Sequence, residues 1–137
     1  MDARLARDAT FELLEYEKLG PADFDVQESD YIELRDEIRA RLIKRAHDLN
    51  ASLVELHSHP GPWPAGFSTS DRRGLRETVP HMWWRLPKRP YLAIGLAPSG
   101  FDAPVWLDNP KVPRALDELV AGTALLKPTN NSLVGWQ

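Results

Sequence analysis

A chain of 137 residues has the length of one domain, and 42% hydrophobic with 27% charged residues is typical of a protein with a buried core. The net charge of −3, without a basic block, argues against a nucleic-acid partner, and no apolar run is long enough to span a membrane. Cysteine is absent, which excludes disulfides, thiolate metal ligands and a cysteine nucleophile, and which is compatible with a cytoplasmic location.

The N-terminal part of the chain carries the weakest local signals. Residues 1–8 show little apolar pattern, whereas residues 10–19 alternate in part, with Phe11, Leu13 and Tyr16 as the side chains expected to face inward. We predict a strand over 10–19. The Gly-Pro step at positions 20 and 21 ends it, and the segment that follows, 22–28, is predicted to be a polar connection.

A long helix is predicted over residues 29–50. Ser29 is a suitable N-cap, and Asp30 places an acid in the first turn, where the helix dipole favours it. Apolar residues recur at helical spacing and form one face; they are Tyr31, Leu34, Ile38, Leu42 and Ile43. The charged residues on the other sides indicate a solvated surface rather than a binding site.

A strand and a second helix are predicted in the middle of the chain. The apolar run at 52–56 predicts a buried strand, and residues 70–86 predict a helix with Ser70 or Asp71 near its N-cap. Pro80 is expected to interrupt or kink that helix.

The C-terminal third is predicted to be mainly extended. The apolar run 91–96 is typical of a central strand, 98–102 of a turn, and 103–107 of a returning strand. Residues 112–126 leave strand and helix open, and the polar residues 128–137 are expected to form a mobile tail. This order of elements predicts an α/β fold with a mixed β-sheet flanked by helices.

The chemistry of the chain is concentrated where the strand at 52–56 ends. His57 and His59 are separated by one residue, so in an extended chain both imidazoles leave the same face and can hold one metal ion. A loop rich in proline and glycine then leads to Ser68 and Asp71. Asp71 can supply an oxygen ligand, and a helix start favours its ionised form. Three such ligands with a fourth position left for water are the arrangement of a catalytic zinc site.

These residues, HSHP followed by seven residues and SxxD, resemble the JAMM (MPN+) zinc metalloprotease motif, and the chain is most similar to small bacterial JAB-type members over roughly residues 10–125. The resemblance implies the MPN/JAB, cytidine-deaminase-like architecture. It also implies Zn²⁺ on His57, His59 and Asp71, with Ser68 as the residue that stabilises the oxyanion. From the residues alone, Ser68 can equally be a loop or cap hydroxyl.

The general base of the family, a glutamate upstream of the motif, has no clear counterpart. Aligned on the family, it falls before Met1; Glu12, Glu15 and Glu17 are the acids nearest to that place, and Glu12 is the best placed of them. Glu55 shares a face with His57 but does not stand where the family keeps its base. We therefore expect either that the natural protein has a further N-terminal segment or that the domain binds zinc without full hydrolytic competence.

The resemblance implies a zinc isopeptidase or peptidase that cleaves at the C-terminal tail of a ubiquitin-like protein. Similar small bacterial proteins often accompany such modifiers together with their activating and conjugating enzymes, in some cases within antiviral defence. Two alternatives remain open. One is a zinc-binding but catalytically impaired module that binds ubiquitin-like tails or serves as a scaffold, and the other is a related peptidase or amidase on a small substrate such as a sulfur-carrier protein.

Overall fold

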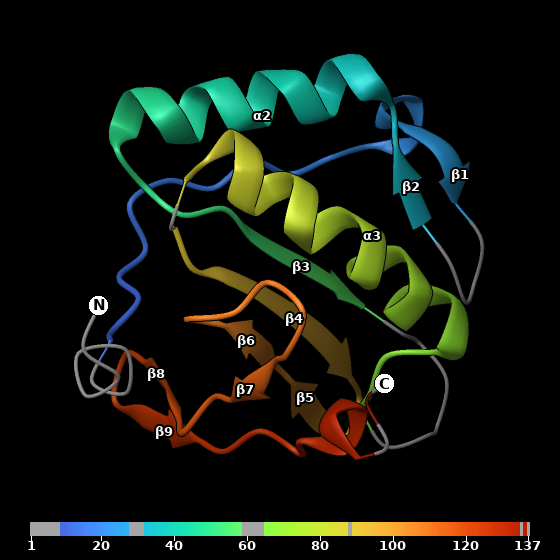
Figure 1. Cartoon of the computed structure of the whole chain (residues 1–137). Helices are drawn as coiled ribbons and strands as arrows, with labels where there is room; N and C mark the ends of the chain where they lie inside the picture. The colour runs from blue at the N-terminus through green and yellow to red at the C-terminus, as the bar shows by residue number, and fades with distance from the viewer. Residues whose placement is uncertain (1–8, 28–31, 59–64, 88, 135, 137) are drawn as a thin grey trace.

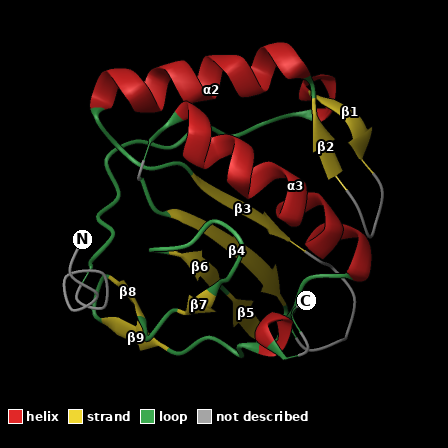
Figure 2. Ribbon diagram, in the orientation of Figure 1, coloured by secondary structure: helices red, strands yellow, loops and turns green. Residues whose placement is uncertain are grey.

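The computed structural model describes residues 9–27, 32–58, 65–87, 89–134 and 136. The fold is mixed α/β, as predicted, and its described residues form two α-helices and a mixed central sheet (Figures 1 and 2). The helices are α2 (Asp36–Leu49) and α3 (Thr69–Arg85). The described part of the chain holds no helix with the length and apolar character needed to cross a bilayer.

The central sheet has the strand order β3-β4-β6-β7, with β5 also paired to β4. Its strands are β3 (Val54–Ser58), β4 (Tyr91–Ala97), β5 (Gly100–Asp102), β6 (Pro104–Trp106) and β7 (Arg114–Ala115). β3 and β4 run parallel, because α3 forms the crossover between them, whereas the remaining pairs are antiparallel. The strands predicted at 52–56 and 91–96 are thereby confirmed, but the first is not buried as predicted, because its apolar residues Val54 and Leu56 are exposed.

Two small antiparallel hairpins accompany the sheet. The first pairs β1 (Phe24–Gln27) with β2 (Ile32–Leu34) and follows a short 3₁₀ helix, η1 (Pro21–Asp23); the second pairs β8 (Leu119–Ala121) with β9 (Ala124–Leu126). Near the C-terminal end lies a second 3₁₀ helix, η2 (Asn131–Leu133). The helical alternative for 112–126 is therefore wrong, because this segment forms β7, β8 and β9.

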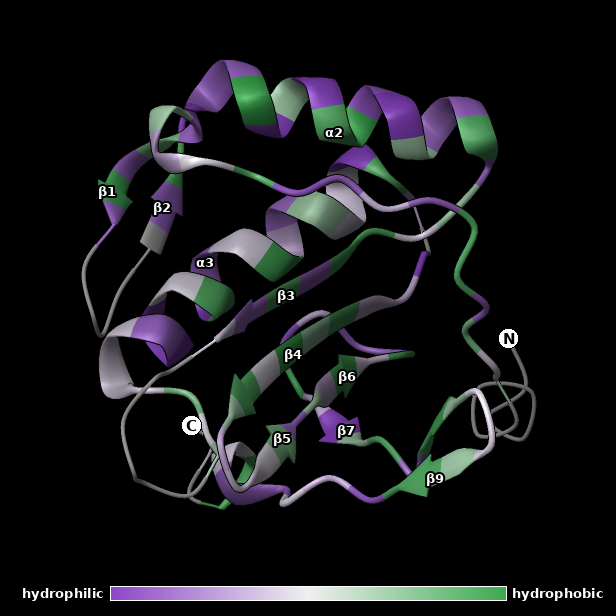
Figure 3. Cartoon of the chain, turned by 180° about the vertical axis from the view of Figure 1, so that it is seen from behind, coloured by the Kyte–Doolittle hydropathy of each residue, from purple (hydrophilic) through white to green (hydrophobic). Residues whose placement is uncertain are grey.

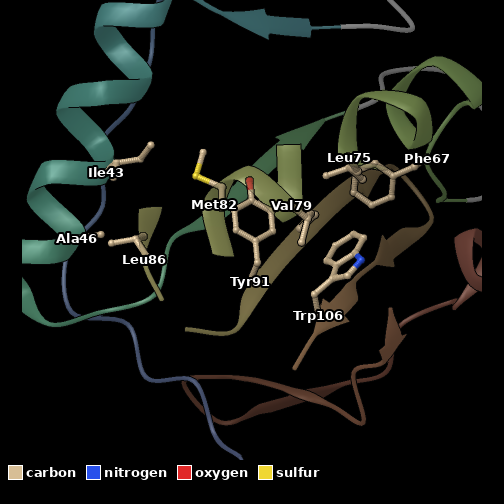
Figure 4. Packing of buried hydrophobic residues seen from close by; sticks show 10 residues of the cluster. Ile43, Ala46, Phe67, Leu75, Val79, Met82, Leu86, Tyr91 and Trp106 are labelled. Carbon is tan, nitrogen blue, oxygen red and sulfur yellow. The ribbon is translucent and has the colours of Figure 1, made fainter. Parts of the chain in front are cut away.

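The core lies between the helices and one face of the sheet. Figure 4 shows this cluster, in which side chains from α2 and α3 meet those of β4 and β6. Its buried members are Ile43, Ala46, Phe67, Leu75, Val79, Met82, Leu86, Tyr91, Ala93 and Trp106. A second cluster, around Leu92, Ile94 and Phe101, lies on the other face of β4, because neighbouring residues of a strand point to opposite faces. Figure 3 shows β4 without a strongly hydrophilic residue, as expected for a strand with apolar side chains on both faces.

The predicted strand at 10–19 is wrong. Residues 9–20 have no regular structure, and two of the side chains expected to face inward are exposed, Leu13 at 78% and Tyr16 at 83%. Phe11 alone of the three packs, against the second cluster. Ion pairs tether the segment to α2, from Arg45 to Glu15 at 2.9 Å and from Arg41 to Glu17 at 2.6 Å. Partial alternation does not make a strand unless a neighbour supplies the ladder of hydrogen bonds.

The long helix predicted over 29–50 begins seven residues later than expected. α2 starts at Asp36 with Arg35 as its N-cap, and Ile32–Leu34 form β2 instead. The partner strand β1 lies in the segment 22–28 that was predicted to be a connection. Pairing between these two segments overrides the helical spacing, and Ser29 lies outside the described residues. The end at Asn50 is confirmed, since Asn50 adopts the left-handed conformation (φ 55°) that closes helices.

The helix predicted over 70–86 is confirmed as α3, and Pro80 is accommodated inside it. Its N-cap is Ser68, however, not Ser70 or Asp71. Two smaller corrections concern the C-terminal third. Gly100–Asp102, predicted to be part of a turn, form β5 against β4. The segment 128–137, predicted to be mobile, contains η2 and the buried Ser132.

Candidate metal centre

The histidine of the motif that the structure describes lies on the inner face of β3. Burial alternates along this strand: Val54 and Leu56 are 45% and 61% exposed, whereas Glu55 and His57 point toward the helices and are shielded. The His57 side chain is 13% exposed. The period of two in a strand therefore places Glu55 and His57 side by side on the face that α3 covers.

Helix α3 brings the aspartate to the same place. The Ser68 Oγ accepts a hydrogen bond from the backbone N–H of Asp71 at 3.0 Å, and Asp71 Oδ2 accepts from the backbone N–H of Ser68 at 3.4 Å. This reciprocal pair is a capping box, which satisfies two N–H groups at the start of the helix. Asp71 is 7% exposed and lies in the first turn, where the helix dipole favours a carboxylate.

The two described ligand candidates face each other. His57 Nε2 lies 3.7 Å from Asp71 Oδ2, although the two residues come from different elements. Two ligands held about 2.0–2.2 Å from one tetrahedral zinc ion are roughly 3.3 Å apart. The observed separation is close to that value, and one nitrogen with one carboxylate oxygen is a donor set that zinc accepts. The described residues therefore fit two ligands of a zinc site.

The opposite nitrogen of His57 faces another carboxylate. Glu55 Oε2 lies 3.6 Å from His57 Nδ1, and Glu55 Oε1 accepts a 2.6 Å hydrogen bond from the hydroxyl of Tyr91 on β4. Histidines that bind metals commonly donate their second ring N–H to a carboxylate, which fixes the tautomer and the ring orientation. Glu55 is the carboxylate placed to take this part, with its Oε2 3.6 Å from His57 Nδ1, and Tyr91 in turn holds Glu55.

Neither Glu55 nor Tyr91 is predicted from the sequence to belong to the site. The sequence places Glu55 on the same strand face as His57 without a role in the site, and Tyr91 is predicted only to be part of an apolar strand. The signal available in the sequence was the spacing of Glu55, a carboxylate two residues before His57, because this spacing places both side chains on one face of a strand. Tyr91 had no such signal, because its contact with Glu55 depends on the register of β3 against β4.

Phe67 fixes the position of the imidazole from a third side. Its ring meets that of His57 edge-on, with 5.1 Å between the ring centroids. Gly95, directly opposite His57 in the β3–β4 register, leaves room for this ring, because a Cβ there would lie 3.4 Å from Phe67. The His57 ring is thus held by Phe67, Glu55 and Asp71.

The remaining predicted site residues are His59 and Glu12. His59 lies outside the described residues, and among those that are described no group of three or more histidine, cysteine, aspartate or glutamate side chains is placed to hold a metal ion. Glu12 is exposed in the irregular N-terminal segment. The assignments of His59 as a ligand and Glu12 as the base therefore stay predictions.

The two carboxylates change the titration of His57. Burial disfavours the charged imidazole, but hydrogen bonding to Asp71 and to Glu55 outweighs burial and raises the pKa of His57 from 6.5 to about 9. The pKa of the neighbouring Tyr91 hydroxyl is also raised, to well above 10.0, but here the causes are burial and the charge of Glu55. Without metal, His57 is therefore protonated at neutral pH and bridges two carboxylates.

This raised pKa predicts a pH dependence for the metal-free protein. A group whose pKa is higher in the folded state stabilises that state fully below its unfolded pKa, and the contribution is lost as the pH rises through the folded pKa. We expect the free energy of unfolding to fall between pH 6.5 and about 9, measured by urea denaturation in the presence of a chelator. His57→Gln should flatten this fall, and an equal fall in both proteins would contradict the assignment to His57.

Comparisons of the chain with protein-family models, with curated proteins and with solved structures found no match.

Proposed function

We propose that this protein is a zinc-dependent isopeptidase or peptidase with the MPN/JAB architecture, acting at the C-terminal tail of a ubiquitin-like protein in the cytoplasm. The observation that carries the proposal is the approach of His57 Nε2 to Asp71 Oδ2 at 3.7 Å, beside Ser68, within the motif that resembles JAMM proteases. Its partners would be that modifier and the enzymes that activate and conjugate it, in a bacterial modification or antiviral defence system.

Each residue of the site has a part in this proposal. His57, His59 and Asp71 would hold the ion, which when bound would lower the pKa of a water molecule and polarise the scissile carbonyl. The Ser68 hydroxyl donates to the oxyanion that develops when this carbonyl is attacked. Glu55 cannot be the base, because it approaches the Nδ1 side of His57 while Asp71 faces Nε2, and because Tyr91 occupies its other oxygen. Glu12 is kept as the candidate base.

The proposal is tested by zinc content and hydrolysis together. The purified chain, refolded with zinc and dialysed, should hold one zinc ion per chain by native mass spectrometry. It should also release a fluorophore from an amide at the C-terminus of one member of a panel of ubiquitin-like proteins, and 1,10-phenanthroline should stop the release. A protein without zinc would refute the proposal. A protein with one zinc that hydrolyses none of the panel would support the alternative, a zinc-binding module that recognises tails without cutting them.

The role of Ser68 can be separated from its role as a helix cap. Ser68→Ala should retain zinc, lose about 1 kcal/mol of stability with the cap, and lose on the order of 3 kcal/mol of transition-state stabilisation, which is about a hundredfold in kcat. Ser68→Gly costs only a few tenths of a kcal/mol as an N-cap but also lacks the hydroxyl.

Unfolding and kinetics of both variants provide the measurement. Equal rate losses in Ser68→Ala and Ser68→Gly, despite their different stabilities, would assign the loss to the hydroxyl. Full activity in either variant would remove Ser68 from the mechanism.

A further inference from the structure

The loop that leads into Ser68 is held by residues more than sixty positions further along the chain. Thr129 Oγ1 and the Asn131 side-chain amide both donate to the backbone oxygen of Ala65, at 2.8 and 2.9 Å. The contact is close, because a Cβ on Gly66 would lie 3.3 Å from the Cβ of Asn131. Figure 1 shows the red C-terminal segment beside the loop that leads into α3.

A buried carboxylate anchors this segment. Asp102 on β5 is fully buried; its Oδ2 accepts from the backbone N–H of Ser132 at 2.9 Å, and its Oδ1 accepts from that of Ala103 at 3.1 Å. Burying a carboxylate is costly unless its oxygens are hydrogen-bonded, so these contacts are expected to be specific. The Ser132 Oγ, 2% exposed as a residue, then accepts from the backbone N–H of Phe67 at 2.7 Å.

Phe67 connects this network to the candidate metal centre. Its N–H is fixed by Ser132, its ring packs on His57, and its carbonyl carbon is bonded to Ser68. The hydrogen bond to Ser132 therefore constrains the backbone at Phe67, and the contact with His57 constrains its ring. A shift of this residue would move the ring that orients His57 and the hydroxyl that caps α3 together.

The same segment also contacts the body of α3. The Trp136 ring packs edge-on against that of Trp106, with 5.6 Å between centroids, and the Arg76 guanidinium lies 5.3 Å from the centre of the Trp136 ring. Cation–π contacts of this kind attract a cation to an aromatic face. The segment thus joins β5, β6, the loop before Ser68 and α3.

We propose that Thr129, Asn131 and Ser132 form a C-terminal clasp that positions Ser68 and His57, so that the segment predicted to be a mobile tail is a working part of the site. The clasp residues act through Ala65 and Phe67. This proposal rests on the proposed function wherever zinc binding is the measurement.

Ser132→Ala tests the clasp most directly, since it removes the acceptor of the Phe67 N–H. The zinc affinity, measured by competition with a chromophoric chelator well below the unfolding temperature, should fall about tenfold or more, as for other residues that orient metal ligands. Ser99→Ala, at an exposed turn between β4 and β5, is the matched control and should bind zinc as the natural chain does. A variant that is less stable but binds zinc with unchanged affinity would show a merely structural role and overturn the proposal.

A second variant and a metal-free measurement keep the test independent of folding and of zinc. Thr129→Val removes one donor to Ala65 and is close in size, and it should shift zinc affinity in the same direction by a smaller factor. In the metal-free protein, both variants should shift the NMR resonances of the Phe67 amide and the His57 ring. Unchanged resonances in both variants would refute the clasp. If the natural chain binds no zinc but the variants still shift these resonances, the proposed function alone is refuted.

Discussion

Asp71→Asn should reduce zinc affinity at least a hundredfold while leaving the start of α3 in place. Asparagine retains an oxygen that can accept from the Ser68 N–H, but it lacks the negative charge that a zinc ligand supplies. The loss should exceed the 10–100-fold typical of partners outside the ligand shell, because Asp71 is proposed to bind the ion itself. His57→Ala should have an effect of the same order, since it removes the facing nitrogen.

The measurement is zinc binding by competition with a chelator, followed by hydrolysis at saturating zinc. Asp36→Asn is the matched control, because Asp36 occupies the first turn of α2, is exposed, and is remote in sequence from the motif. Both proteins lose one carboxylate near a helix start, so their difference isolates the role of Asp71. If Asp71→Asn binds zinc as tightly as Asp36→Asn, Asp71 is not a ligand.

Glu55→Gln should lower zinc affinity about 10–100-fold, the second large effect that the structure predicts. The substitution preserves shape but removes the charge beside His57 Nδ1. Without that charge, the tautomer with Nε2 available to the metal is less favoured. Tyr91→Phe removes the 2.6 Å hydrogen bond that orients Glu55 and should act in the same direction by a smaller factor.

Zinc competition and the ¹⁵N resonances of the His57 ring together measure this effect. Glu77→Gln, an exposed change of the same chemistry on α3, is the control. A Glu55→Gln protein with natural zinc affinity and an unchanged imidazole tautomer would show that Glu55 does not orient His57.

The parts of the fold that sequence predicted correctly are those specified locally. α3 was found because its apolar positions and the polar residues at its start agree with one helix, and β4 was found because a run of apolar residues is buried on both faces. The predictions failed at 10–19 and at the start of α2. At 10–19 no neighbouring strand among the described residues supplies a ladder of hydrogen bonds, and at the start of α2 the pairing of β1 with β2 overrides the helical spacing.

The sequence by itself determined the candidate ligands His57, His59 and Asp71, because strand periodicity and a helix start require only neighbouring residues. Tertiary structure alone decided what surrounds His57 and Asp71. Glu55 meets Tyr91 across 36 positions, and Phe67 meets Ser132 across 65. No local periodicity encodes such contacts, since they depend on the register of parallel strands and on where the C-terminal segment returns to the sheet. The proposed ligands can be chosen from the chain, whereas the groups around His57 require the fold.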